Sequence, residues 1–173
     1  SDYNKIVKHI QELEDAGHQI QLHIHPHWID SVFENESWVI DSTRYKLSDW
    51  SVSAARDIIE LSVNELNKHL KHKVFAFRAG GWCIQPFSHI SDALKKSNIS
   101  LDSTVFKNGL STSKSHTFDF RLAPNKTQWA FDSDPCLEVD NGYFTEVPIS
   151  AKSVSPIFYW RFALVKLFGN KIF

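Results

Sequence analysis

A regular alternation of helical and strand patterns over the first hundred residues constrains this chain most. Apolar residues recur at helical spacing in three segments, and a short strand-like segment follows each one. The helical segments are 6–17, 53–70 and 86–98, and the strand-like segments are 19–25, 74–77 and 99–101. Parallel strands need such helical crossovers, so the order predicts an α/β fold with parallel strands. We find no internal repeat and no linker, which favours a single domain over 1–173.

The rest of the chain is less regular. Residues 28–50 have no clean period, and a connection of that length in a compact domain is usually a functional loop or lid. Residues 118–149 look more β-like, with a hairpin turn expected at 140–142. Ser155 and Pro156 are expected to open a final apolar helix. This helix would cover a barrel edge or pack on a missing part of the protein rather than lie on a membrane surface.

Composition excludes several classes of protein. The 173 residues are 42% hydrophobic with a formal net charge of -1, so nothing indicates a nucleic-acid partner. Two cysteines, Cys83 and Cys136, cannot build a disulfide scaffold or a four-cysteine zinc site, and Cys83 has no nearby group to activate it as a nucleophile. No stretch of eighteen uncharged apolar residues occurs, so no membrane span is expected.

The ends of the chain suggest a segment of a longer protein. The sequence holds no methionine, opens directly in a helical pattern, and is still apolar-rich at 162–173. We therefore expect that the domain lacks its N-terminal strand and its C-terminal end. The unpaired cysteines and the absence of a visible signal peptide favour the cytoplasm.

Histidines provide the strongest chemical signal. Four of the nine lie within ten residues, and His23 and His25 share one face of the strand expected at 19–25. His27, beyond Pro26, can turn to the same side. Imidazole is a common metal ligand, and several at the end of a parallel strand suit zinc or another divalent ion. The alternative is that these histidines only form ordinary hydrogen bonds within the protein. That interpretation is the usual one for a lone histidine, but three alternating histidines favour a metal site.

This segment resembles a known motif. Gly17-His18-Gln19-Ile20, followed by His23-x-x-x-His27, is similar to the second motif of the polysaccharide deacetylases, the NodB-homology proteins of carbohydrate esterase family four. The segment 77–82 lies where that family has Arg-x-Pro-Tyr, and 101–103 resembles a later strand end with an aspartate. The resemblance covers about residues 3–110 and is closest to a subgroup linked to lipopolysaccharide biosynthesis.

The resemblance implies a partial or distorted (β/α) barrel, with His23 and His27 as metal ligands and His25 in the same pocket. It also implies that Arg78 orients a catalytic aspartate. Asp102 would hold Arg78 or a ligating histidine, and the plainer alternatives are a surface arginine and a turn or cap aspartate. The strands expected at 19–25, 74–77 and 99–101 should all finish at the same end of the sheet. This would bring Arg78 and Asp102 into one pocket with the histidines.

Two further roles follow from residue chemistry. The glycines around Gly81 permit a close approach of backbone N–H groups to an oxyanion, so Gly81 is a candidate catalytic position. Trp28 and Trp82 are candidate substrate-binding residues that stack on sugar faces, although a tryptophan is more often part of the core.

The chain also departs from the family. The Asp-Asp pair that supplies the base and a metal ligand is absent, as is the final Leu-x-His, and His116 does not match it. Gly80 and Gly81 replace the Pro and Tyr of the third motif. We therefore expect little activity from this chain by itself.

These observations predict a metal-dependent hydrolase that removes acetyl groups from an acetylated sugar or polysaccharide. Two alternatives stay open. One is a non-catalytic, carbohydrate-binding relative, and the other is a metal hydrolase of the amidohydrolase or PHP type, which needs more ligands than we can place.

Overall fold

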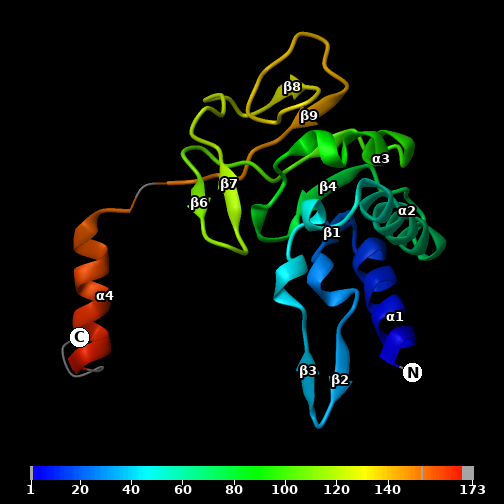
Figure 1. Cartoon of the computed structure of the whole chain (residues 1–173), viewed down its shortest axis with the longest axis horizontal. Coiled ribbons are helices and arrows are strands. Elements are labelled where there is room, and N and C mark those ends of the chain that lie inside the picture. The colour runs from blue at the N-terminus through cyan, green and yellow to red at the C-terminus, as the bar shows by residue number, and fades with distance from the viewer. Residues whose placement is uncertain (1, 153, 169–173) are drawn as a thin grey trace.

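The computed structural model describes residues 2–152 and 154–168. Its centre is a five-stranded sheet in the order β1-β4-β5-β9-β8 (Figure 1). These strands are β1 (Leu22–Ile24), β4 (Ala76–Ala79), β5 (Leu101–Asp102), β9 (Phe144–Glu146) and β8 (Trp129–Phe131). The first four pair in parallel, and β8 pairs antiparallel with β9. The predicted α/β fold with parallel strands is confirmed.

Three helices connect or flank the parallel strands: α1 (Asp2–Asp15), α2 (Val52–His69) and α3 (Ser91–Lys96). Helix α1 is followed by Gly17, which has φ +89° and closes the helical segment expected over 6–17. The N–H groups of Gly17 and His18 donate to the carbonyls of Glu14 and Leu13, which is the Schellman pattern. At the start of α2, the Ser51 hydroxyl accepts from the Ala54 N–H at 3.1 Å, as an N-cap should.

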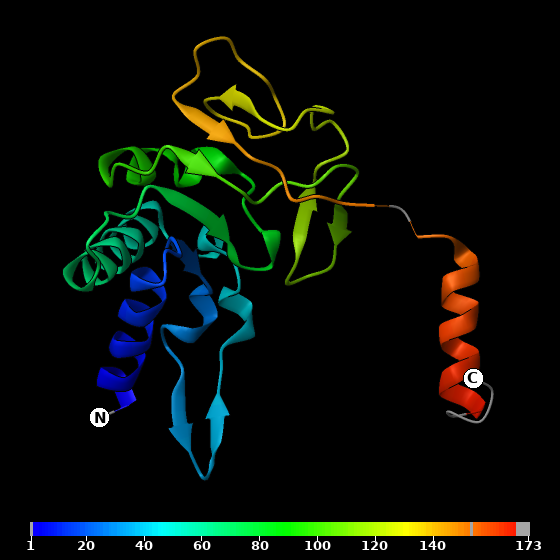
Figure 2. The ribbon, with the colours of Figure 1, turned by 180° about the vertical axis from the view of Figure 1, so that it is seen from behind.

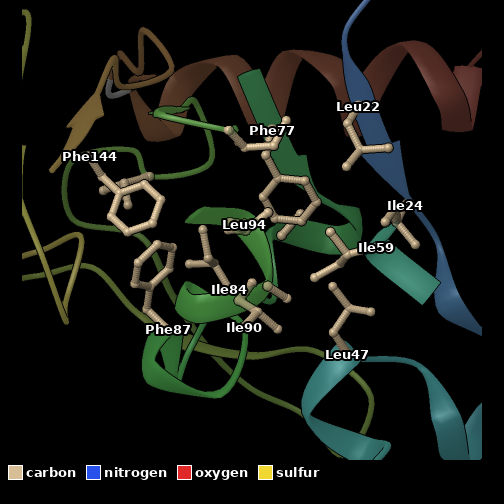
Figure 3. Close-up of a cluster of buried hydrophobic side chains, with 14 of the residues drawn as sticks. Leu22, Ile24, Leu47, Ile59, Phe77, Ile84, Phe87, Ile90, Leu94 and Phe144 are labelled. Carbon is tan, nitrogen blue, oxygen red and sulfur yellow. The ribbon is translucent and has the colours of Figure 1, made fainter. Parts of the chain in front are cut away.

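One face of the sheet packs on α2 and α3 to form the core. Leu22, Ile24 and Phe77 point to this face and are buried with Ile59 of α2 and Leu94 of α3, as Figure 3 shows. Alternation along each strand therefore sends the neighbouring side chains, including His23 and Arg78, to the other face, where both are exposed. β1 is an outermost strand of the sheet, with β4 as its neighbour.

Two hairpins and several single-turn 3-10 helices fill the connections. The segment at 28–50 contains the hairpin β2 (Val32–Glu34) and β3 (Ser37–Val39), which projects from the body of the molecule (Figure 1). A second hairpin consists of β6 (Leu110–Thr112) and β7 (Thr117–Asp119). The 3-10 turns lie at 26–28, 42–44, 47–49, 80–82 and 87–89.

Several boundaries differ from the sequence expectation, and β1 occupies only 22–24 of the strand expected at 19–25. The strand expected at 74–77 lies at 76–79, because Arg78 and Ala79 pair in register with β1. The helix expected from Pro86 begins with a 3-10 turn, and α3 starts at Ser91. The turn at 140–142 does not close a tight hairpin, since β8 ends at Phe131 and a long loop leads to β9.

The last helix, α4 (Pro156–Phe168), begins where Ser155 and Pro156 predict. It stands away from the rest of the molecule at the end of an extended segment, and both views agree on this (Figures 1 and 2). Its apolar side chains are exposed, so the expected covering of a sheet edge is not seen. Among the described residues, no helix combines the length and the apolar character that crossing a membrane requires.

Candidate functional site: a histidine cluster at the sheet edge

The histidines lie at the carboxyl end of β1. His23 pairs in register with Arg78 of β4, and the chain turns at Pro26 into a 3-10 helix that contains His27. Because β1, β4 and β5 are parallel, their carboxyl ends lie at one edge of the sheet. The expectation that Arg78 and Asp102 end at the same edge as the histidines is confirmed.

The hydrogen bonds of His23 fix the orientation of its ring. Its Nδ1 lies 2.9 Å from the carbonyl oxygen of Arg78. A carbonyl oxygen only accepts, so Nδ1 donates, and Nε2 is the ring nitrogen that remains for a ligand. That Nε2 lies 3.0 Å from Nε2 of His25. A backbone carbonyl on the far nitrogen is a common way to orient a metal-binding histidine.

His25 lies at the centre of the cluster. Its ring meets that of His23 edge-on, with centroids 4.7 Å apart, and that of His27 at 5.4 Å. Burial lowers the pKa of His25, and the neighbouring histidines His23, His27 and His116 lower it further. Burial, together with His116, also lowers the pKa of His27. Both rings are therefore held neutral, which is the state that binds a metal ion.

Two aromatic residues that the sequence did not assign to the site complete the cluster. The ring of Tyr45 stacks on His27 at 4.6 Å and meets His116 at 4.2 Å. Tyr45 comes from the long segment 28–50, and His116 from the loop between β6 and β7. Only the interpretation of 28–50 as a functional loop pointed toward Tyr45, and no sequence signal indicated His116.

The two glycines after β4 make this packing possible. A Cβ on Gly80 would lie 2.4 Å from the Ile24 carbonyl oxygen and 2.9 Å from Nδ1 of His25. A Cβ on Gly81 would lie 2.7 Å from Cε1 of Tyr45. Gly81 also has φ +59°, which favours glycine. The backbone at Gly80 and Gly81 therefore lies close against the histidine cluster.

Arg78 lies beside His23 on the open face of the sheet. Its guanidinium donates to the carbonyl oxygen of Ser103 at 2.6 Å and to the Ser103 hydroxyl at 2.8 Å. His23, Arg78 and Ser103 line a hollow of about 330 Å³. A second hollow, of about 560 Å³, runs between β1 and α2 and is lined by His23, His25 and Glu65 among others. His23 thus borders two open spaces.

Asp102 does not share this pocket, which differs from the sequence expectation. It pairs in register with Phe77, so its side chain is buried on the opposite face of the sheet from Arg78. Its carboxylate accepts from the N–H and hydroxyl of Thr104, at 3.0 and 2.8 Å. These contacts match the alternative role of a turn residue, and Ser103 takes the place expected for Asp102 beside Arg78.

Asp102 instead forms a buried carboxyl pair with Glu146 of β9, which is in register with it. Burial raises the pKa of Glu146 far above its ordinary value, and the adjacent Asp102 raises it further. Oε2 of Glu146 is buried and has no hydrogen-bond partner when the carboxyl group is ionised. When protonated, the carboxyl group can donate a hydrogen bond to Asp102. We conclude that Glu146 is protonated at neutral pH.

The two tryptophans expected to bind substrate are both about half exposed. Trp28 lies beside His27, with ring centroids 5.7 Å apart. Trp82 packs edge-on against Phe106 and Phe118. A cavity of about 570 Å³ between Gln85 and the β6–β7 hairpin is lined by none of the histidines.

The donor set can be compared with the needs of a metal ion. Within 2–152 and 154–168, no three His, Cys, Asp or Glu side chains are already arranged as a ligand set. The Nε2 atoms of His23 and His25 converge, and Nδ1 of His27 is buried without a hydrogen-bond partner. The imidazoles thus suit a borderline metal such as zinc in chemistry and in protonation state.

Comparison with family models, with curated proteins and with solved structures gave no match.

Proposed function

We propose that this domain is a metal-dependent deacetylase that acts on an acetylated sugar or polysaccharide, in the synthesis or modification of a cell-surface glycan such as lipopolysaccharide. The observation that supports this best is the orientation of His23. Its Nδ1–H donates to the Arg78 carbonyl and its Nε2 faces His25, at the carboxyl end of the parallel strands, where α/β folds place their sites. In this proposal the sheet belongs to a distorted (β/α) barrel. The two buried free thiols are compatible with a cytoplasmic location.

His23 and His27, with His25 between them, would hold the ion, here zinc or another divalent metal. When bound, such an ion polarises an acetyl carbonyl and acidifies water. The chain's own residues then position the substrate. The Gly80-Gly81 backbone approaches the cluster closely enough to face a developing oxyanion, and Arg78, anchored on Ser103, places a positive charge beside His23.

One observation favours a non-catalytic carbohydrate-binding protein as the second candidate. None of the hydrogen bonds described for His23, His25 and His27 involves a carboxylate, and Asp102 faces the other side of the sheet. A general base contributes about 10²–10⁴-fold to such a reaction. We therefore expect weak turnover from this chain even when the metal is bound.

Metal content and acetate release test the proposal together. Purified protein loaded with zinc and dialysed should retain about one ion per chain. His23→Ala and His27→Ala should each lose it, whereas His9→Ala, an exposed histidine on α1, should keep it. Unchanged zinc in both site variants would contradict the proposal. Zinc binding with no acetate released from acetylated chitooligosaccharides, even at high enzyme concentration, would favour the carbohydrate-binding alternative.

A further inference from the structure

The hairpin beside the histidine cluster exposes an unusual amount of aromatic surface. We call residues 28–40, which contain β2 and β3, the aromatic arm. Trp28, Phe33 and Trp38 are 47%, 60% and 55% exposed. They contact one another edge-on: Trp38 lies 5.7 Å from Trp28 and 5.3 Å from Phe33, with interplanar angles of 80° and 61°. An edge-to-face contact covers one face of one ring, and the exposure of the three side chains leaves the other faces accessible to a ligand.

The aromatic arm continues directly from the candidate site. Ring contacts run from His25 to His27 at 5.4 Å and from His27 to Trp28 at 5.7 Å, and then along the arm. Phe33 and Trp38 are cross-strand partners and so lie on the same face of the hairpin. Because the hairpin projects from the body (Figure 2), this path suits an extended ligand whose one end lies at the histidines.

The arm is also acidic. The segment 28–44 contains four carboxylates and one arginine. Arg44 is already engaged, in an ion pair with Asp30 at 2.6 Å and over the ring of Trp50. Asp41 accepts hydrogen bonds from Thr43. Within the described residues, the carboxylates of Glu34 and Glu36 have neither a hydrogen bond nor an ion pair.

Glu36 also stands where another residue would fit the backbone better. Asn35 and Glu36 form the two-residue turn of the hairpin, with φ +49° and +62°. A turn of this type favours Asn-Gly, and glycine at the second position would adopt its conformation without strain. A carboxylate held at a strained, exposed hairpin tip is a reason to look for a ligand that needs the charge.

We propose that the aromatic arm binds an amino-sugar oligosaccharide, with sugar rings on Trp28, Trp38 and Phe33. Its free ammonium groups would be attracted by the negative charge of Glu36 at the hairpin tip and of Glu34 on the reverse face of the hairpin. The inference rests on the proposed function, because removal of N-acetyl groups leaves sugar ammonium groups. Aromatic faces attract ammonium ions, and unpaired carboxylates strengthen that attraction. The same acidic charge disfavours nucleic acid and anionic lipid as occupants.

Calorimetric titration tests the proposal, with the β-1,4-linked glucosamine tetrasaccharide and its fully N-acetylated form as probes. The double variant Phe33→Ala plus Trp38→Ala should bind both tetrasaccharides about tenfold more weakly. Trp160→Ala is the control, because Trp160 is even more exposed, at 70%, but lies on α4. Equal affinity in the arm variant and the control would overturn the proposal, as would the absence of saturable binding to either probe by the unmodified chain.

A second variant leaves the rings in place. Glu34→Gln plus Glu36→Gln should weaken binding of the glucosamine form about tenfold and reduce its salt dependence, with the N-acetylated form unaffected. Glu12→Gln plus Glu60→Gln removes the same charge from α1 and α2 and should change neither affinity. Equal losses for both probes, or none in the arm variant, would contradict the assignment of the carboxylates.

Two further measurements separate this inference from its alternatives. His23→Ala plus His27→Ala should lose the metal but retain tetrasaccharide binding. An unmodified chain that binds the tetrasaccharides but holds no metal and releases no acetate would refute the proposed function without refuting the arm. Light scattering after size exclusion tests self-association. A dimer that the Phe33→Ala plus Trp38→Ala variant dissociates, with no tetrasaccharide binding by the unmodified chain, would make the arm a subunit interface and overturn the proposal.

Discussion

At the scale of single residues, the buried pair of Asp102 and Glu146 makes stability depend on pH. Glu146 stays protonated in the folded chain, because burial and Asp102 raise its pKa, while the unfolded chain ionises near its ordinary value of about 4.3. Above that pH the folded state therefore binds more protons than the unfolded state. The stabilisation by protonated Glu146 is complete below about pH 4 and is lost as the pH rises toward the pKa of Glu146 in the folded chain. The free energy of unfolding should fall by up to about 1.4 kcal/mol per pH unit.

Glu146→Gln tests this directly. The amide keeps a hydrogen-bond donor toward Asp102 but does not titrate, so urea unfolding between pH 5 and 8 should show a flatter dependence than the unmodified chain, with the variant more stable at pH 8. Glu138→Gln, which removes only a surface ion pair with Lys126, should leave the slope as it is. Parallel slopes in all three proteins would mean that Glu146 is ionised when folded.

Gly81 is the second residue whose conformation has a measurable consequence. Gly81→Ala places a methyl group 2.7 Å from the Tyr45 ring and adds strain at φ +59°, so we expect a loss of about 1–3 kcal/mol in unfolding free energy and altered ring signals of Tyr45 and His116. Gly17→Ala is the control. Its φ is +89° but its Cβ meets nothing within 4 Å, so it should lose stability with those ring signals unchanged. Identical spectra for the two variants would show that Gly81 does not shape the cluster.

At the scale of elements, α4 differs from every other helix described. The described side chains from Pro156 to Leu167 are at least partly exposed, and large apolar residues such as Ile157, Trp160 and Leu167 are 70% exposed or more. A helix that is apolar on all sides is normally buried against something. The two hairpins also differ from each other in burial. The β2–β3 hairpin is exposed, whereas the β6–β7 hairpin contributes Phe118 to the core.

Truncation after Lys152 tests the independence of α4. Because α4 adds nothing to the buried core, the shortened chain should unfold at the same urea concentration, to within experimental error. It should also bind less of a hydrophobic dye and associate less at high concentration, because a large apolar surface is gone. A substantial drop in the unfolding midpoint would show that α4 packs on the body in solution.

At the scale of the whole molecule, the sheet decides which distant segments meet. Its parallel strands bring the ends of β1, β4 and β5 to one edge, and the loops from 28–50 and from β6–β7 then close over the histidines with Tyr45 and His116. At these strand ends, the two faces of the sheet carry different side chains. One is open and carries His23 and Arg78, and the other is buried and carries the Asp102–Glu146 pair.

The sequence by itself determined the features that depend on local periodicity and local hydrogen bonds. Helical spacing of apolar residues identified the helices, and their alternation with short strands identified the parallel sheet. The cap at Ser51 and the turn at Gly17 are local features of the same kind. Alternation also placed His23 on one face of β1. The order of strands further placed Arg78 and Asp102 at the same sheet edge, because parallel strands end together.

Only the tertiary structure decided which side chains face one another. Register aligns Arg78 with His23 but Asp102 with Phe77, and because side chains alternate along a strand, that single-residue offset turns Asp102 into the core and leaves Ser103 beside Arg78. Tyr45, His116 and Glu146 reach their partners across long stretches of chain. Their positions depend on how loops and strands pack, which no local pattern encodes.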